Sequence, residues 1–263
     1  MKTIALVGSP NCGKTTLFNA VTGLHQHVGN WAGVTVERKE GTQNGVKWVD
    51  LPGVYALSPY SAEEKVTIDY LSGGDYDEIL QIVDATALAR GLYLTHQLTQ
   101  LSRPMTIALN MMDECRKRGI TIDTEELSVR LGIRVLPMSA RDGTGVPELL
   151  RALKDGAKTP KSPPSAPYTA IIQLMKSALP AGNLPSEFRA WKALEGDERG
   201  AAEAARAGQA QLRAQSGMSA AAALSALRYA WADDLCAAVR RGNPDNPTRA
   251  DVIDALVLHP VLA

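Results

Sequence analysis

The chain has 263 residues, with 28 basic and 28 acidic side chains that leave no formal net charge. Its length allows one or two domains with a sizeable core, and its balanced charge offers no electrostatic case for binding nucleic acid or an anionic membrane surface. Three scattered cysteines, no signal peptide and no apolar stretch long enough to span a bilayer predict a soluble intracellular chain without disulfides.

The first residues form an apolar run that leads into a glycine-rich turn and then into a helical pattern. The turn matches G-x-x-x-x-G-K-[ST], a pattern in which backbone N–H groups and a helix N-terminus surround a polyphosphate. In that pattern the lysine, here Lys14, reaches the β- and γ-phosphates, and the hydroxyl of Thr15 binds Mg²⁺. We predict these nucleotide contacts: Gly8, Ser9, Pro10, Asn11, Cys12, Gly13, Lys14, Thr15 and Thr16.

A glycine-rich segment with little helical or strand period follows the first helix, at residues 25–35. We expect a long functional loop there, and then two strands at 34–42 and 46–50 that are joined at Asn44-Gly45. Thr35 is placed to add its hydroxyl to the Mg²⁺ shell when a γ-phosphate is present, which would make the loop a nucleotide-sensing switch. A threonine that only opens a strand is the alternative. Further predicted nucleotide contacts are Gly33, Val34 and Thr35.

The second of these strands ends in an Asp-x-x-Gly motif, residues 50–53. Phosphate-loop NTPases hold Mg²⁺ through an aspartate at this position, so we predict that Asp50 is a metal ligand. The Pro-Gly pair lets the backbone turn toward the γ-phosphate, which gives Gly53 a catalytic role. Val54 follows, where many regulatory GTPases carry the Gln that orients the attacking water. The predicted contacts of this motif are Asp50, Leu51, Pro52 and Gly53.

Strand and helix patterns then alternate at short intervals. Predicted helices lie at 62–71, 89–101, 124–131 and 147–153, and predicted strands at 79–83, 105–109 and 135–138. This alternation indicates an α/β fold with a doubly wound, mostly parallel sheet, one antiparallel hairpin and helices on both faces.

Polar residues that recognise a base follow the strand predicted at 105–109. A carboxylate such as Asp113 can accept hydrogen bonds from the ring N–H and the exocyclic amine of guanine, whereas adenine has the reverse pattern at that edge. Asn110 and Asp113 therefore predict GTP rather than ATP, and the loop at Ser139-Ala140 would support the same base. The predicted base contacts are Asn110, Met111, Asp113, Ser139 and Ala140.

A Pro-rich segment at 158–167 reads as a stiff linker. We place a domain boundary there, between a GTP-binding domain at 1–160 and a helical domain at 161–263. The second half shows no convincing strand; its predicted helices are 171–177, 186–194, 197–215, 219–240 and 248–258. The stripe Leu224, Leu227, Trp231 and Leu235 has the spacing of a helix face that belongs to a core.

These motifs occur in the order and context of translation-factor-related small GTPases, which the chain resembles. Three stretches, at 27–39, 50–61 and 258–262, closely resemble the cytosolic portion of the prokaryotic ferrous iron transporter FeoB. The resemblance implies a Ras-like P-loop NTPase domain followed by a smaller all-α spacer that favours the GDP-bound state, like a GDP-dissociation inhibitor. It also implies a location at the cytoplasmic face of the bacterial inner membrane.

The resemblance further implies Mg²⁺-dependent, slow GTP hydrolysis that regulates or is coupled to Fe(II) uptake. The implied partners are GTP and GDP, the protein's own transmembrane iron-permease domain and small accessory Feo proteins, with no nucleic acid; the oligomeric state stays open. A GTPase of ribosome or tRNA biology, and a module that binds GTP without hydrolysing it, are the alternatives. No iron site is expected, because the histidines are scattered: His25, His27, His96 and His259.

The phosphate loop also resembles those of potassium-activated GTPases. Val54 cannot make the hydrogen bonds of a catalytic Gln, so another source of positive charge is needed at the phosphates. The resemblance implies that the amide oxygen of Asn11 holds K⁺, with the carbonyls of Gly29 and Trp31 completing its shell, although Asn11 as a brace of the loop is the alternative. Two residues depart from the family pattern: Cys12 replaces the usual Ser, and Ala32 the usual Pro.

Overall fold

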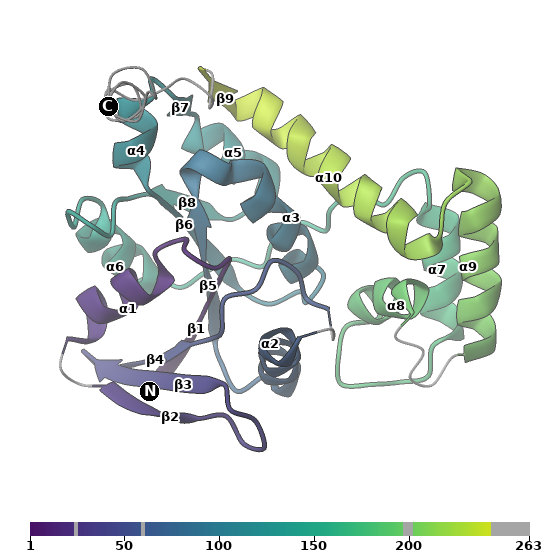
Figure 1. Ribbon diagram of the computed structural model, residues 1–263, viewed down its shortest axis with the longest axis horizontal. Coiled ribbons are helices and arrows are strands. Elements are labelled where there is room, and N and C mark those ends of the chain that lie inside the picture. Colours follow the sequence, from purple (N-terminus) through teal and green to yellow (C-terminus); the bar gives the residue numbers. More distant parts are fainter. Residues whose placement is uncertain (24–25, 59–60, 197–201, 243–263) are drawn as a thin grey trace, which may run out of the picture.

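A mostly parallel sheet forms the centre of the computed structural model, which describes residues 1–23, 26–58, 61–196 and 202–242 (Figure 1). In their order across the sheet, its strands are β2 (Gln26–Asn30), β3 (Glu37–Gln43), β4 (Val46–Asp50), β1 (Lys2–Gly8), β5 (Glu78–Asp84), β6 (Met105–Asn110) and β8 (Arg134–Pro137). The pairs β2–β3 and β3–β4 are antiparallel, and all other neighbours in this sheet are parallel. The parallel strands are linked through helices because a tight turn cannot join them.

Helices cover both faces of this sheet. They are α1 (Lys14–Thr22), α2 (Ala62–Gly73), α3 (Leu88–Thr99), α4 (Met112–Lys117), α5 (Thr124–Leu131) and α6 (Val146–Lys154). In β1, Ile4 and Leu6 pack in a core with residues of α1 and α6, whereas Ala5 and Val7 pack in a second core with residues of α2, α3 and α5. Because both faces are buried, the parallel strands are nearly continuous apolar runs. The predicted fold class, with helices on both faces of the sheet, is confirmed.

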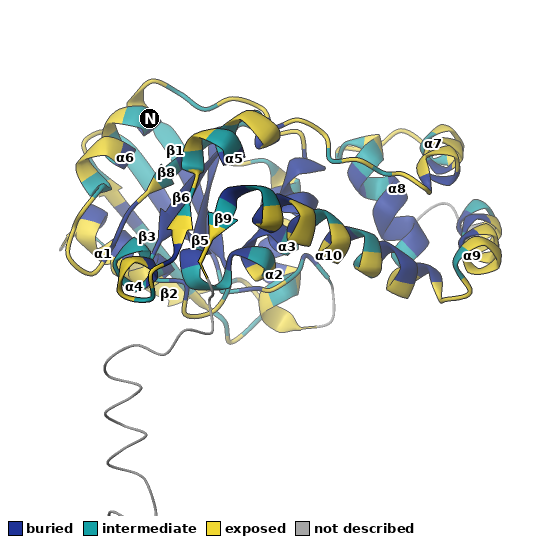
Figure 2. Ribbon diagram, turned by 90° about the horizontal axis from the view of Figure 1, so that it is seen from above, coloured by how far each residue is buried: buried dark blue, intermediate teal, exposed yellow. Residues whose placement is uncertain are grey.

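A helical portion follows, made of α7 (Thr169–Ala178), α8 (Ser186–Glu195), α9 (Ala202–Ser216) and α10 (Ala220–Val239). The long helix α10 runs from the helical portion to the side of the sheet domain where α3 and α5 lie (Figure 1), and it contributes to two cores. Its first half packs Ala223 and Leu224 with residues of α7, α8 and α9, and its second half packs Leu235 and Val239 into the core shared with α3 and α5. Figure 2 shows that exposed residues lie on the outer sides of the helices and that the central strands are buried. The predicted stripe on α10 does contribute to the cores.

Several predicted elements need correction. The segment expected to be a loop contains β2, an edge strand that is exposed except at half-buried Gln26. An edge strand with both faces exposed carries no apolar alternation, so pattern reasoning missed it and also started β3 three residues early. Two further short elements, α4 and the two-stranded pair of β7 (Thr121–Ile122) with β9 (Arg240–Arg241), were not predicted. Where the other predicted helices and strands lie within the described residues, they agree with the structure to within a few residues.

Some predictions fall outside the described residues: His25, the start of the helix predicted at 197–215, the helix predicted at 248–258, and the 258–262 motif with His259. The predicted linker begins close to the first unit, since the N–H of Met105 donates to the carbonyl of Lys158 and the N–H of Lys161 donates to that of Leu131. The division at residue 160 stays a prediction, because α10 crosses back into the core of the first unit. Among the described residues, no helix is both long enough and apolar enough to cross a membrane.

His96 lies buried where α3 meets α8 and α10. Its ring packs edge-on against Trp191 and Trp231, with ring centroids 5.0 and 5.1 Å away. Its Nδ1 lies 3.3 Å from the amide nitrogen of Gln100, and its Nε2 has no hydrogen-bond partner among the described residues. Burial, followed by the nearby charge of Arg228, lowers the pKa of His96 to about 3. The junction therefore requires a neutral imidazole.

This neutral imidazole predicts a stability that falls in mild acid. Below about pH 6.5 the unfolded chain protonates His96, whereas the folded chain resists protonation until about pH 3, so acidification in this window favours the unfolded state. Between pH 7.5 and pH 5 the wild type should lose about 2 kcal/mol more of its unfolding free energy than a His96→Leu variant loses. Urea unfolding across this range measures the difference. Parallel pH profiles for the two proteins would contradict the assignment.

Candidate functional site

A hollow of ≈ 500 Å³ opens at the carboxyl end of β1, where the glycine-rich turn leads into α1. Its lining residues are Ser9, Pro10, Asn11, Gly13, Lys14, Thr15, Thr16, Gly53 and Met111. Ligands of open α/β sheets bind at the carboxyl ends of the strands, and a helix N-terminus favours negative charge there. The sequence-predicted phosphate loop thus forms one wall of a concave site.

Two glycines give this loop its close turn. Gly13 has a φ of 88°, and a Cβ there would lie 2.1 Å from the amide nitrogen of Asn110. A Cβ on Gly8 would lie 2.6 Å from both the carbonyl oxygen of Ile82 and the sulfur of Cys12. Asn11 also has a positive φ, of 64°, a conformation that asparagine tolerates better than most residues. Any side chain at Gly8 or Gly13 would push the loop off the strands behind it.

Three predicted ligands of phosphate and metal meet beside the hollow. Lys14 forms an ion pair with Asp50, and both side chains are almost fully buried. The hydroxyl of Thr15 lies 3.5 Å from the other carboxylate oxygen of Asp50. Carboxylate and hydroxyl oxygens are the donors that Mg²⁺ prefers, so this oxygen pair fits the predicted ion. Lys14 also lines the hollow, so a phosphate bound there would compete with Asp50 for its ammonium group.

The Asp-x-x-Gly segment runs against the start of the phosphate loop. The N–H of Leu51 donates to the carbonyl of Leu6 at 3.1 Å, and the N–H of Val54 donates to that of Gly8 at 3.0 Å. Gly53 passes close to the loop, because a Cβ on it would lie 3.1 Å from the backbone of Pro10. Val54 points into the core and is 2% exposed. Its side chain therefore cannot orient a water in the hollow.

Asn110 holds two loops of the site together. Its side-chain N–H donates to the carbonyl of Cys12 at 2.8 Å, and its side-chain oxygen accepts from the N–H of Ala140 at 2.8 Å. Asn110 is 3% exposed, so these bonds use its amide inside the protein. The predicted base contact of Asn110 stays a prediction, and the structure shows that its amide is also a brace between the phosphate loop and the Ser139-Ala140 loop. The chemistry of Asn in an N-x-x-D motif alone could not distinguish these roles.

The other predicted base contacts lie around this brace. Asp113 is at the start of α4, with a side chain that is 17% exposed and 3.9 Å from Lys117. Met111 adopts a φ of 65° and lines the hollow. Ser139 is buried. Unlike the amide of Asn110, the carboxylate of Asp113 does not join two loops of the site, so it is available to a base.

The predicted switch loop lies away from the hollow. Thr35 is exposed, between β2 and β3, and Gly33 and Val34 share that connection. Gly29 is paired with Arg38 in the β2–β3 ladder, and the carbonyl of Trp31 accepts a hydrogen bond from Val34. The residues that line the hollow include none of Gly29, Gly33, Val34, Trp31 and Thr35. For Thr35 to reach Asp50, or for Gly29 and Trp31 to reach Asn11, the loop must move.

Trp31 packs this loop against α2, a contact that the sequence did not reveal. Its ring meets that of Tyr70 on α2 edge-on, with centroids 5.4 Å apart, and the Arg38 guanidinium lies 4.8 Å over it. Tyr70 in turn stacks on Tyr76 at 6.0 Å. A conformational change of the loop must therefore break an aromatic contact, which is worth about 1 kcal/mol beyond its buried area.

Cys12 is not poised for reaction. Its thiol is buried, and burial raises its pKa to about 11. Because the thiolate is the reactive form, this raised pKa keeps the thiol inert, and the Ser-to-Cys departure affects little more than the loop's packing. Within the described part of the chain, no group of three or more His, Cys, Asp and Glu side chains is arranged to hold a metal ion.

The fold and the site define a class. A mostly parallel sheet with helices on both faces, a G-x-x-x-x-G-K-[ST] loop at the end of its first strand and an Asp-x-x-Gly segment beside it are the features of a phosphate-loop domain of the GTPase type.

The comparisons with known proteins identify the family. The family model described as ferrous iron transport protein B matches residues 2–153, so the chain belongs to the FeoB family. The Fe(2+) transport protein A/Fe(2+) transporter FeoB fusion protein of Porphyromonas gingivalis is 44% identical over 212 residues, which are 74% of this chain and 25% of that protein. The Fe(2+) transporter FeoB of Escherichia coli is 41% identical over 222 residues, 79% of this chain and 28% of that protein. The chain thus spans about a quarter of the length of these relatives.

Solved structures agree with the fold. A GDP-bound variant of the S. thermophilus FeoB G-domain matches with a TM-score of 0.82 at 36% identity, over 92% of this chain and 100% of that one. The cytosolic domain of L. pneumophila FeoB matches with a TM-score of 0.80 at 35% identity, over 91% of this chain and 100% of that one. The resemblance found in the sequence is confirmed, including the helical portion that follows the sheet.

If Asn110 braces the two loops, its removal should lower both the stability of the protein and its affinity for nucleotides, whichever base the nucleotide carries. Asn110→Ala leaves the buried carbonyl of Cys12 and N–H of Ala140 without these partners, which should cost about 2–4 kcal/mol of unfolding free energy. Guanine and xanthine nucleotides should both bind more weakly, because the phosphate loop loses its support. Urea unfolding and titration with fluorescent nucleotides check this. A variant of wild-type stability that binds xanthine nucleotides normally would show that Asn110 is only a base contact.

Proposed function

We propose that this chain is the GTP-binding and GTP-hydrolysing cytosolic domain of a ferrous iron transporter, and that it regulates or is coupled to Fe(II) uptake through a membrane domain beyond this sequence. The observation that carries the proposal is the meeting of Lys14, Thr15 and Asp50 beside a glycine-lined hollow at the end of β1. Relatives named Fe(2+) transporter FeoB and a GDP-bound FeoB G-domain support the iron and the nucleotide parts.

Phosphate binding follows from the loop's own groups. Gly13, Lys14, Thr15 and Thr16 at the start of α1 line the hollow, and the free N–H groups and the dipole of a helix N-terminus favour an anion there. The ammonium group of Lys14 leaves Asp50 for the phosphates, which frees the carboxylate for Mg²⁺. Thr15 and Asp50 would hold that ion, which neutralises phosphate charge when bound. Thr35 joins them only after the switch loop moves, as a response to the γ-phosphate.

Guanine recognition is assigned to Asp113. Its carboxylate would accept two N–H groups from guanine, while Asn110 keeps the phosphate loop and the Ser139-Ala140 loop at a fixed separation. Adenine offers the opposite pattern of donors and acceptors at that edge and should be rejected.

This assignment is tested with Asp113→Asn. Exchanging the carboxylate for an amide should move preference from guanine toward xanthine nucleotides, by about 100-fold in the ratio of dissociation constants, since a mismatched pair of buried hydrogen bonds costs about 3 kcal/mol. Competition between labelled GDP and unlabelled xanthosine diphosphate measures it. The unfolding free energy serves as control and should stay unchanged. Wild-type affinity for GDP in this variant would refute the base assignment.

Val54 cannot make the hydrogen bonds of a catalytic Gln, so GTP hydrolysis needs another group that stabilises the charge of the transition state at the phosphates. We infer that Asn11 holds K⁺ beside the phosphates and that the carbonyls of Gly29 and Trp31 join its shell when the switch loop closes over the nucleotide. Two observations support this: Asn11 lines the hollow, and Val54 is buried away from it. A fixed charge at the β- and γ-phosphates stabilises the transition state more than the ground state. Catalysis is then shared by Asn11, Lys14, Thr35 and Gly53.

The proposed K⁺ site predicts that the rate of GTP hydrolysis depends on which monovalent cation is present. GTP hydrolysis should be faster in K⁺ than in Na⁺ at equal ionic strength, by about tenfold or more, and the difference should vanish in Asn11→Ala while GDP binding is largely kept. Phosphate release in the two salts measures it. Equal rates in both salts for the wild type would contradict the bound K⁺. The attacking water would then have to be positioned by backbone groups of the switch loop or by the membrane domain.

The remaining partners follow from the relatives. The share of the relatives that this chain spans leaves room for a transmembrane iron-permease domain, so we place the chain at the cytoplasmic face of the inner membrane. The fused Fe(2+) transport protein A of the P. gingivalis relative supports an accessory Feo protein as a partner. We assign residues 161–263 to a helical spacer that favours the GDP-bound state; α10 gives it a direct contact with α3.

A further inference from the structure

We propose that Lys192 and Gln97 are positioning residues for the segment 54–58 that follows the Asp-x-x-Gly motif, because they hold the N–H and the C=O of Leu57 from two different units of the protein. The inference rests on the proposed GTPase function and adds a regulatory contact to it. In this proposal, a change at the nucleotide site reaches the helical portion through the hydrogen bond between Leu57 and Lys192.

The first contact comes from the sheet domain. The side-chain oxygen of Gln97 on α3 accepts a hydrogen bond from the N–H of Leu57 at 2.6 Å. Gln97 is 2% exposed and the Leu57 side chain is fully buried, so the bond is shielded from water. A buried N–H without a partner costs about 1–3 kcal/mol, which makes this contact a real constraint on the segment.

The second contact comes from the helical portion. The ammonium group of Lys192 on α8 donates to the carbonyl of Leu57 and also bonds Glu195 at 2.8 Å. Lys192 is 7% exposed, and burying an ammonium group without such hydrogen-bond and charge partners is costly. Leu57 is therefore held at its N–H by α3 and at its C=O by α8.

The position of Lys192 is itself fixed. Glu195 pairs with Arg228 of α10, and the guanidinium of Arg228 lies 4.8 Å over the ring of Trp191. Burial acts to raise the pKa of Glu195, but Arg228 and Lys192 outweigh it and hold the pKa below its ordinary value, so the carboxylate stays charged. Two buried cations, Lys192 and Arg228, thus flank the half-buried carboxylate of Glu195 in one connected row. Lys192 can follow Leu57 only if this row shifts with it.

The contact is placed to respond to nucleotide. Leu57 lies four residues after Gly53, which lines the hollow, and the segment between them starts at a hydrogen bond from Val54 to Gly8. A γ-phosphate that draws in Gly53 must pull on a segment anchored at Leu57. The arrangement seen has Thr35 exposed and outside the hollow, so it is not the arrangement that engages a γ-phosphate.

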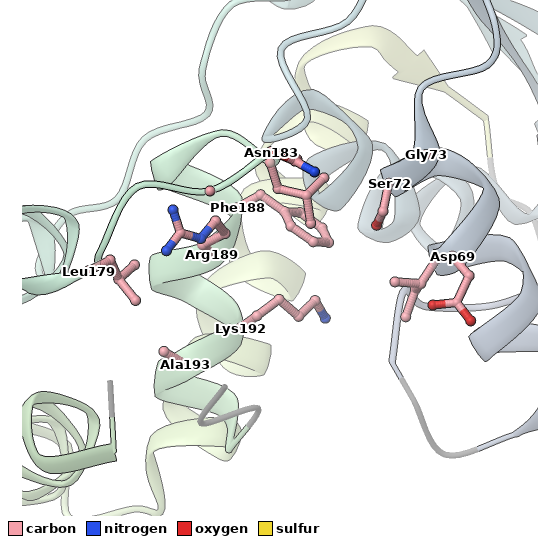
Figure 3. A pocket seen from close by; sticks show the side chains of 12 residues that line it. Asp69, Ser72, Gly73, Leu179, Asn183, Phe188, Arg189, Lys192 and Ala193 are labelled. Atoms are coloured by element: carbon pink, nitrogen blue, oxygen red, sulfur yellow. The ribbon is translucent and has the colours of Figure 1, made fainter. Parts of the chain in front are cut away.

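The nucleotide site could also be linked to the helical portion through α2, but a hollow separates part of α2 from α8. A hollow of ≈ 490 Å³ lies between α2 and α8, with Asp69 and Ser72 on one side and Phe188 and Arg189 on the other. Figure 3 shows Lys192 extending from α8 toward this space, on the side that faces Asp69. Lys192 bonds the loop before α2 rather than α2 itself. The connection between nucleotide and helical portion therefore passes through Leu57.

Four variants test this in the whole chain, through the dissociation rates of fluorescent GDP and of a non-hydrolysable GTP analogue. Lys192→Met and Gln97→Met each remove one hold on the observed arrangement, so each should lower the ratio of GTP-analogue to GDP dissociation rates by about fivefold to tenfold. Lys192→Arg keeps a donor and should restore most of the ratio. Lys176→Met is the matched control: it removes an ion pair with Glu187 in the same helical portion and does not contact Leu57.

The double variant separates coupling from general loosening. Because both side chains hold the same residue, Lys192→Met with Gln97→Met should change the ratio by clearly less than the product of the two single effects. Wild-type ratios in both single variants, or a ratio in Lys176→Met that changes as much as theirs, would overturn the inference. A wild type that binds neither nucleotide would refute the proposed function instead.

A measurement on the wild type keeps the test independent of variant folding. Hydrogen exchange at the N–H of Leu57 should be at least tenfold faster with the GTP analogue than with GDP, because the rearranged segment leaves Gln97. Equal protection in the two complexes would show that the hold on Leu57 does not change with nucleotide, and would overturn the inference.

Discussion

The two hydrogen bonds of the Asn110 side chain are the constraint on which the site depends. They join the end of β6 to the phosphate loop on one side and to the loop after β8 on the other. Gly13 must lack a side chain because the Asn110 amide occupies the space that a Cβ would take. The loops for phosphate and base are therefore set at a fixed separation by the folded protein, which reduces the ordering cost of binding.

A second constraint joins the site to the helical portion. Because α10 lies in two cores, the helical portion cannot move freely away from α3, and His96 fills the junction between them with a ring that must stay neutral. Leu57 lies close to this junction and is held by a side chain from each unit. The packing thus provides a short physical path from Gly53 to the helical portion, made of one loop and two hydrogen bonds. Coupling along such a path needs no large rearrangement of the core.

Local patterns were enough to predict a mostly parallel sheet with helices on both faces, and the residues that line the hollow. Glycine and lysine at fixed spacing, Asp50 at a strand end and the N-x-x-D motif each have a local physical requirement. The edge strand β2 was missed because it buries no apolar face. The brace role of Asn110, the contact of Trp31 with Tyr70 and the hold of Lys192 on Leu57 join residues far apart in the sequence, so no spacing rule could predict them.

The hollow beside Lys14 and Asp50 is proposed to be a site for a guanine nucleotide whose walls are in place before binding. A crystal structure of the chain with GDP and Mg²⁺ would show whether this is so. We expect phosphates against the backbone of residues 9–16, Lys14 moved from Asp50 to a phosphate oxygen, Asp50 in the shell of Mg²⁺, and Asn110 still bonded to Cys12 and Ala140. Nucleotide bound elsewhere, or Lys14 still paired with Asp50 while GDP fills the hollow, would contradict it.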